Sequence, residues 1–216
     1  MAKEIEKQRK KAVSEHKRTL ILEAARRVFE KEGLDGASLR AIASEAGYTP
    51  AALYFHFESR EEIYAELLSH SLANLRGFVD KAVKKATAPL DKFRAAAFSV
   101  FQFYAKRPKD LDLGFYLFKG GMTPKGVGRE RDHRLNEQFA DCLQPIAVAA
   151  SELGADETAS KRLMVDIFSY ATGSLLMEHT GRIRIFDMSS QELMRAFIEE
   201  KITICNWEEN HAHLKR

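Results

Sequence analysis

The sequence predicts an all-α protein of about nine helices, in which a small three-helix domain precedes a larger helical domain. Apolar residues recur at three- and four-residue spacing along the chain, and no stretch combines sustained apolar–polar alternation with strand-joining turns. The length of 216 residues accommodates a small domain joined to a larger one. We therefore expect two domains, residues 1–60 and residues 61–216.

Glycines and a capping serine define the first two helices. Apolar residues over 21–29 form one helical face, and Gly33 ends that helix. Ser38 has the hydroxyl that an N-cap needs, and the segment 39–46 carries a second apolar stripe. Gly47 then ends the second helix and lets the chain turn.

Two capping signals define the next two helices. Thr49 followed by Pro50 is typical of an N-cap with proline in the first turn, so a short helix begins there. Ser59 and Glu62 form a capping box, in which the hydroxyl accepts from the backbone of Glu62 and the carboxylate reaches back. The apolar face that follows continues to residue 84, so the fourth helix is long.

The remainder of the chain predicts five more helices. Pro89 starts the first of them, and Ser189 with Glu192 forms a second capping box before the last. The expected segments are 89–106, a shorter piece around 115–118, 128–153, 156–181 and 189–208. Residues 120–128 contain four glycines and one proline and are the clearest irregular loop.

Positive charge is concentrated near the N-terminus. Residues 1–57 hold 11 basic and 8 acidic side chains, whereas residues 58–216 hold 23 of each. Residues 1–28 alone hold nine basic and four acidic side chains. A basic arm ahead of a neutral body is typical of a protein that meets a polyanion, although such arms are also common as solvated tails.

Cysteine usage and the N-terminal composition indicate the compartment and exclude several classes of protein. Cys142 and Cys205 are isolated, which argues against a disulfide framework or a thiolate zinc site. The first 18 residues are charged where a signal peptide is apolar, and no apolar run long enough for a membrane span follows. The sequence contains no phosphate-binding glycine loop, no HExxH motif and no nucleophile elbow, so no motif in it indicates catalysis. We expect a cytoplasmic protein that is not an enzyme and has no membrane span, metal or cofactor.

Residues 38–57 have the form of a helix-turn-helix, with two short helices, a glycine turn and a capped second helix. Such a unit is also common as a helical hairpin in a core. The residues decide between the two. RTLILEAARRVF at 18–29 and SLRAIASEAGYTPAALYFHFESREEI at 38–63 closely resemble the DNA-binding domain of the tetracycline-repressor (TetR) family of bacterial transcription regulators. The resemblance covers roughly residues 15–65 and implies binding to double-stranded operator DNA.

The resemblance assigns most DNA contacts to phosphates, with the third helix in the major groove. Tyr54 and His56 stand where the family places phosphate-binding groups, and Arg60 stands where it usually has lysine. Thr49 offers a hydroxyl and backbone amides at a helix N-terminus. Further phosphate contacts are expected from Lys17, Arg18, Ser38 and Arg40.

Base reading is less well defined in this sequence. Pro50, Ala51 and Ala52 offer no side-chain hydrogen bonds and at most an apolar contact to a thymine methyl group. Tyr48 replaces the small β-branched residue common in the family, and it either contacts DNA or packs. We expect sequence preference to draw on Arg40, Tyr48, backbone groups and DNA shape.

The resemblance also implies that the larger domain dimerises through the last two helices. Two recognition helices spaced about 34–36 Å apart read two half-sites. The expected interface residues are Tyr170, Ser174, Met177, Leu193, Phe197 and Ile204. The alternative for each is packing within one chain, because cores and interfaces have similar compositions.

The middle helices supply side chains suited to a pocket for a small apolar or aromatic effector. The candidates are Phe98, Phe101, Gln102, Tyr104, Phe115, Tyr116, Phe118, Met164, Phe168 and Thr172. Such residues at helical spacing are also typical of an ordinary core.

These observations predict a homodimeric DNA-binding regulator, a repressor that a small ligand releases from operator DNA. A regulator without a small-molecule effector is one alternative. An α-helical enzyme with an aromatic substrate pocket is another.

Overall fold

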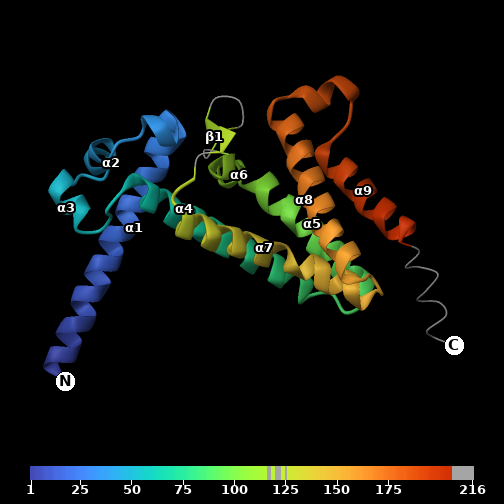
Figure 1. The fold of residues 1–216 in the computed structure, drawn as a ribbon, viewed down its shortest axis with the longest axis horizontal. Helices are drawn as coiled ribbons and strands as arrows, with labels where there is room; N and C mark the ends of the chain where they lie inside the picture. Colours follow the sequence, from blue (N-terminus) through green and yellow to red (C-terminus); the bar gives the residue numbers. More distant parts are fainter. Residues whose placement is uncertain (116–117, 120–122, 125, 206–216) are drawn as a thin grey trace. The chain divides into compact units, whose positions relative to one another are not determined.

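The computed structural model describes residues 1–115, 118–119, 123–124 and 126–205 (Figure 1). Within them lie nine α-helices, one 3₁₀-helix and two strands of two residues each, so the predicted all-α class is confirmed. The chain forms two compact units. The first unit comprises residues 1–70 with 112–135, and the second comprises 71–111 with the chain from 136 onward. The expected domain division after residue 60 stays a prediction.

The helices of the N-terminal part follow the predicted order. They are α1 (Ala2–Gly36), α2 (Leu39–Glu45), α3 (Pro50–Tyr54) and α4 (Arg60–Val83). The basic arm is itself helical, so α1 begins well before the apolar face from which the first helix was predicted. Gly33 interrupts the helical geometry of α1 with a φ of 68°.

The predicted caps are present. The Ser38 and Thr49 hydroxyls accept from backbone amides three residues later, at 3.1 and 3.2 Å. The Ser59 hydroxyl accepts from the Glu62 amide at 3.1 Å. These local bonds satisfy amides that a helix leaves unpaired at its N-terminus, which explains why the helices begin where the sequence predicted.

An apolar core holds the helices of the first unit together. Its fully buried members include Ile21, Phe29, Ile42, Leu53, Phe57 and Tyr64. The rings of Phe29 and Tyr64 meet nearly edge-on with centroids 5.7 Å apart. The buried Tyr64 hydroxyl donates to the carbonyl of Leu113, which gives it a partner inside the core.

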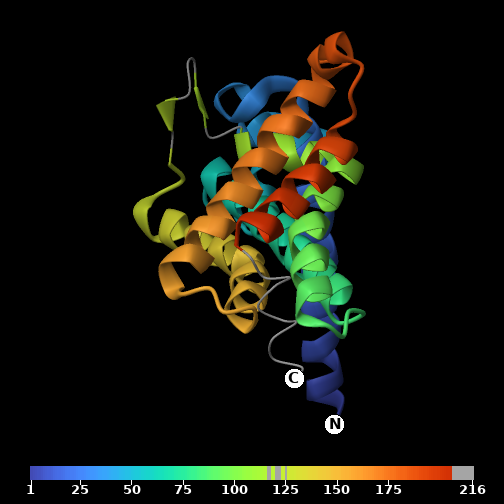
Figure 2. The same cartoon turned by 90° about the vertical axis from the view of Figure 1, so that its right-hand side faces the viewer.

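The rest of the chain forms further helices and a minimal hairpin. The elements are α5 (Pro89–Lys106), α6 (Pro108–Phe115), α7 (Arg129–Glu152), α8 (Glu157–His179), the 3₁₀-helix η1 (Arg182–Phe186) and α9 (Ser190–Ile204). The short helix expected around 115–118 was placed wrongly, since α6 ends at Phe115 and strand β1 (Phe118–Lys119) follows. Strand β2 (Thr123–Pro124) lies in the region predicted to be irregular and pairs antiparallel with β1. Helices α5, α8 and α9 pack side by side (Figure 2). No helix in the described parts of the chain is long and apolar enough to cross a bilayer.

Candidate nucleic-acid interface

Helices α2 and α3 and the turn between them form the candidate site. The two helices pack against each other, and α2 also packs on α1. Gly47 makes the turn with a φ of 71°, a left-handed conformation that favours glycine. Leu53 of α3 and Ile42 of α2 are fully buried, which fixes how α3 is held. The arrangement is that of a helix-turn-helix.

Most of the residues predicted to meet DNA lie on the surface of this unit. The exposed ones are Lys17, Ser38, Arg40, Thr49, Pro50, Ala51 and Tyr54, and the half-buried ones are Arg18, Tyr48, Ala52, His56 and Arg60. The Tyr54 side chain is 57% exposed at the end of α3. The Ser38 and Thr49 hydroxyl oxygens accept the capping bonds described above, so each O–H stays available to donate.

Arg18 has a structural role that the sequence did not reveal. Its guanidinium donates to the Glu66 carboxylate from Nε at 2.8 Å and from Nη2, and Nη2 lies 3.5 Å from Glu62. Nη1 donates to the carbonyl of His56 at 2.5 Å, and the group lies 4.0 Å from the centre of the Phe57 ring. The Glu66 hydrogen bonds raise the pKa of Arg18 above its ordinary value. Arg18 therefore ties α1 to the α3–α4 turn and to α4.

Arg60 is also engaged by the protein. It pairs with Glu61 at 2.9 Å, and its Nη1 donates to the carbonyl of Ala37 at 3.1 Å. This second bond connects the start of α4 to the residue before the Ser38 cap. Arg60 thus holds the helix-turn-helix in place, while its half-buried side chain still reaches the surface.

The sequence reasoning missed Phe55. Its side chain is 89% exposed directly after Tyr54. Phe55 is two residues from both of the buried Leu53 and Phe57 and has helical φ and ψ, so it lies on the side of the helix opposite these two residues.

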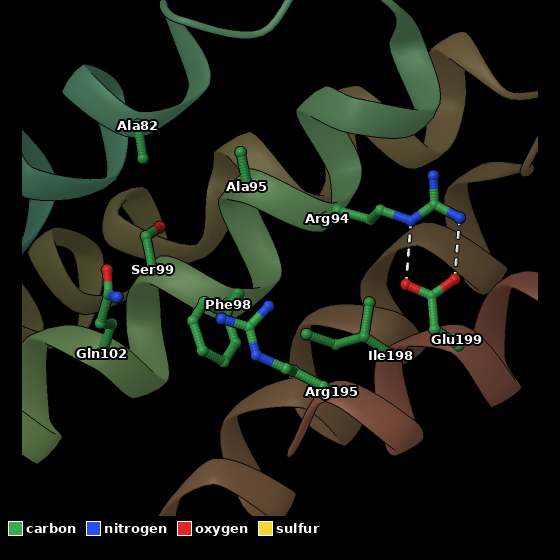
Figure 3. Close-up of a pocket in the computed structure, with 9 residues that line it drawn as sticks. All are labelled: Ala82, Arg94, Ala95, Phe98, Ser99, Gln102, Arg195, Ile198 and Glu199. Carbon is green, nitrogen blue, oxygen red and sulfur yellow. Dashed lines mark hydrogen bonds and ion pairs between the residues drawn. The ribbon is translucent and has the colours of Figure 1, made fainter. Parts of the chain in front are cut away.

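A pocket in the second unit includes two of the predicted effector residues. It has a volume of about 490 Å³ and lies between α4, α5 and α9 (Figure 3). Phe98 and Gln102 line it, and the Arg195 guanidinium lies 4.1 Å from the Phe98 ring centre. Beside them Arg94 donates two hydrogen bonds to Glu199, at 2.9 and 2.8 Å. Arg195 was missed because only the packing of α9 on α5 brings it to this pocket.

The other predicted effector residues whose side chains the structure describes do not line this pocket. Phe101 and Tyr104 are buried, and burial raises the pKa of Tyr104. The Tyr104 ring packs against Phe168, with centroids 6.4 Å apart. Met164 lines a separate pocket of about 550 Å³ formed by α7 and α8. Thr172 has a buried hydroxyl oxygen without a hydrogen-bond partner among the described residues. Tyr116 and the side chains of Phe115 and Phe118 lie outside the described residues.

The predicted dimer residues divide into two groups. Tyr170 and Phe197 stack on each other with centroids 4.0 Å apart, and Ser174 is buried and donates to the Ala171 carbonyl. These three residues make contacts within the chain, and their place in a dimer interface stays a prediction. Leu193 is half-buried, whereas Met177 and Ile204 are exposed.

Additional apolar side chains stand exposed near Met177 and Ile204. The residues that the sequence analysis missed are Val165, Leu176, Ile185, Phe186 and Met188, on α8, η1 and the segment after it. They were missed because helical spacing does not indicate which apolar residues the neighbouring helices leave uncovered.

Comparison with known proteins identifies the family. Residues 21–67 match the family model of bacterial regulatory proteins, tetR family. The chain is 32% identical over 108 residues to the HTH-type transcriptional repressor KstR2 of Mycolicibacterium smegmatis. The aligned segment covers 44% of this chain and 53% of KstR2. It is 34% identical over 89 residues to the HTH-type transcriptional activator FasR of the same species, 41% of each protein. The chain spans about half the length of these curated relatives.

The fold is similar to that of the transcriptional regulator FadR from Bacillus subtilis, whose crystal structure is a complex with stearoyl-CoA. The TM-score is 0.67 at 16% identity, over 85% of this chain and 97% of FadR. Residues 21–67 therefore form a domain of the kind found in the tetR family of bacterial regulatory proteins.

Proposed function

We propose that this protein is a transcriptional regulator that binds operator DNA through α2, α3 and the turn between them. The observation that carries the proposal is the capped helix-turn-helix, with Arg40 and Tyr54 exposed, in the segment that matches the family model. The excess of positive charge within residues 1–57 adds the attraction to phosphates that such binding requires.

The exposed groups divide by chemistry into two sets. Lys17, Arg40 and Tyr54 suit phosphate oxygens, because each ends in an N–H or O–H donor. Phe55 and Ala51 offer only apolar contact, which suits the methyl group of thymine. Phosphate contacts then hold the protein on DNA, and sequence preference comes from apolar contacts and DNA shape.

The test is DNA binding by matched variants. The probe is a fluorescent duplex that the wild-type protein selects from a random-sequence library. Arg40→Ala and Tyr54→Phe each remove one donor, so we expect affinity to fall about tenfold with unchanged circular dichroism. Lys161→Ala removes an exposed positive charge of α8 and is the control. Equal affinities for all four proteins would exclude this site as the DNA interface.

We further propose that the protein acts as a homodimer through the exposed apolar side chains of α8, η1 and α9. Leu176, Ile185 and Ile204 are each more than half exposed, an unfavourable exposure that a second copy relieves. Leu176→Asp is expected to yield monomers in sedimentation velocity, whereas Val148→Asp, at an exposed valine of α7, leaves the dimer intact. A wild-type monomer at micromolar concentration would refute this part of the proposal.

A small ligand bound in the second unit is the proposed signal that releases DNA. Phe98 with Arg195 offers an apolar ring beside a cation, which suits a molecule with an apolar body and an anionic group. A ligand that prefers the conformation with low DNA affinity weakens DNA binding by its differential affinity.

Stearoyl-CoA and stearate are suitable probes, since FadR was crystallised with the former. Saturating ligand at about 100 times its dissociation constant stabilises the fold by about 2.7 kcal/mol, a clear rise in melting temperature. Phe98→Ala is expected to abolish this rise in melting temperature. The control is Val148→Asp, which should show the same rise as wild type. A probe that binds and leaves DNA affinity unchanged would contradict ligand-controlled release.

A further inference from the structure

Residues 4–17 of α1 form a helical extension that no other described element of the first unit covers. The helix begins at Ala2, whereas the match to the family model begins only at residue 21. Every residue from 4 to 17 is exposed. Figure 1 shows this part of α1 projecting beyond α2 and α3, which belong to the same compact unit. The extension therefore needs an explanation that the helix-turn-helix by itself does not supply.

The extension continues the buried face of α1 as a stripe of positive charge. Residues seven apart lie on nearly the same side of a helix. Steps of seven back from the buried Ala24 reach Lys17 and Lys10, steps back from Ala25 reach Arg18 and Lys11, and steps back from Ile21 reach Ser14 and Lys7. The side of α1 that packs on the helix-turn-helix is thus the side that becomes basic beyond it.

The C-terminal end of the stripe lies next to the end of α3, the expected recognition helix. Arg18, its last member, donates to the carbonyl of His56 just after α3. From Lys17 to Lys7 the helix rises about 15 Å, which matches about four phosphates along one DNA strand. The basic stripe and the exposed end of α3 are therefore close enough to follow one duplex.

The charges of the stripe are poorly compensated within the chain. Lys7 stands three and four residues from Lys10 and Lys11, and like charges at these spacings destabilise a helix. Glu6 pairs with Lys10 at 2.8 Å and Glu15 with Lys11 at 3.8 Å, but both pairs are largely exposed and contribute little. Phosphates supply the missing negative charge.

The opposite face of the extension argues against a membrane surface as the partner. Ile5 and Val13 are exposed there, but Arg9 and His16 lie between them around the helix. An interfacial helix needs a continuous apolar face.

We propose that residues 4–18 form a rigid basic helix that binds the phosphates of DNA flanking the segment read by α3. This inference rests on the proposed function, because it extends the same interface. It makes the affinity depend on duplex length and on salt, without adding base contacts.

The experiment compares two duplexes with one selected site. The short duplex has about 20 bp and contains only the two half-sites, which lie one DNA helical turn apart. The long duplex carries the same site with about one further turn of DNA on each side. The main variant is K7Q/K10Q/K11Q/K17Q, whose changes are all at exposed positions. The second variant is Ser14→Pro, which keeps every charge and breaks the helix.

On the long duplex we expect the four-lysine variant to bind about 10- to 100-fold more weakly at low salt, with a salt slope smaller by about 3. Ser14→Pro reproduces most of this loss, and Arg9→Gln on the opposite face changes affinity less than threefold. On the short duplex Ser14→Pro and Arg9→Gln bind nearly as tightly as wild type, and the four-lysine variant loses only the contact of Lys17.

Three results would overturn the inference. Equal binding of wild type and the four-lysine variant on the long duplex removes the extension from the interface. Full activity of Ser14→Pro shows a flexible tail instead of a helix. Lysine-dependent binding to anionic phospholipid vesicles with no effect on DNA assigns the stripe to a membrane. By contrast, a wild-type protein that selects no duplex at all defeats the proposed function itself.

Discussion

Replacing Arg18 with alanine tests whether this residue holds the helix-turn-helix together. The change removes the hydrogen bonds to Glu66, the bond to the carbonyl of His56 and the stacking on Phe57. It also leaves Glu62 and Glu66 one turn apart without the cation between them. The expected result is a less stable first unit and a less well positioned α3.

The size of the effect follows from the bonds and their exposure. A hydrogen bond to a charged group contributes about 1.5–3 kcal/mol, and an exposed cation–π contact about 0.5–1 kcal/mol. The Arg18 side chain is 34% exposed, so solvent screens part of this interaction. We expect Arg18→Ala to lower the free energy of unfolding by about 2–3 kcal/mol and Arg18→Lys by about half as much, since lysine lacks the fork of donors.

Arg27 provides the matched control. It also lies on α1 and makes an ion pair, with Glu45 of α2 at 2.6 Å, but the two side chains are 55% and 43% exposed. Arg27→Ala is expected to cost less than about 1 kcal/mol. The assay is urea unfolding followed by circular dichroism at a fixed protein concentration, because dimerisation makes stability concentration-dependent. Equal midpoints for Arg18→Ala and Arg27→Ala would refute the reasoning.

Three further predictions concern the turn, a cap and the cysteines. Gly47→Ala places a side chain at a φ of 71° and is expected to lower the free energy of unfolding by about 1–2 kcal/mol. Gly77→Ala inside α4 has open space around the new methyl group and should raise the free energy of unfolding by about 0.5–1 kcal/mol. Urea midpoints of the two variants that shift in the same direction would contradict this prediction. Thr49→Ala removes the N-cap of α3 and is expected to cost about 1 kcal/mol and to weaken DNA binding, while Thr49→Ser should restore both. Burial raises the pKa of the Cys142 thiol to about 11, so a disulfide reagent at pH 8 is expected to label Cys205 in the native protein and Cys142 only after unfolding. Because the folded state favours the neutral thiol, the contribution of Cys142 to stability is present below pH 9 and is lost as the pH rises from 9 to 11. Rapid labelling of Cys142 in the native protein would disprove this prediction.

The helix boundaries were predictable because they depend on neighbouring residues. The Ser38 and Thr49 caps and the Gly47 turn involve atoms at most a few residues apart, and all three have the predicted geometry. The segment 89–106 was likewise predicted from its prolines and apolar spacing and is helix α5. The family resemblance on residues 18–63 needed no structure either, since it rests on the identity and order of the residues.

The roles of charged and aromatic side chains were less predictable. Arg18 and Arg60 both look like phosphate ligands in the sequence, yet both bind acceptors 20 or more residues away in the chain. Phe55 was not singled out in the sequence and is 89% exposed, and Phe197, expected at a dimer interface, stacks on Tyr170 of the same chain. The type of a residue shows which contacts its side chain can make, but not which partner it contacts in the folded protein.

By itself the sequence determined that this protein is all-α, that it carries a helix-turn-helix similar to that of the TetR family, and where the capped helices α2, α3 and α4 begin. These properties follow from short-range backbone bonding and from the periodicity of apolar residues. Only the tertiary structure decided which face of α1 packs on α2 and α4, that Arg195 joins Phe98, and which apolar residues stay exposed. Those outcomes depend on contacts between distant segments, and such contacts form only when the helices pack.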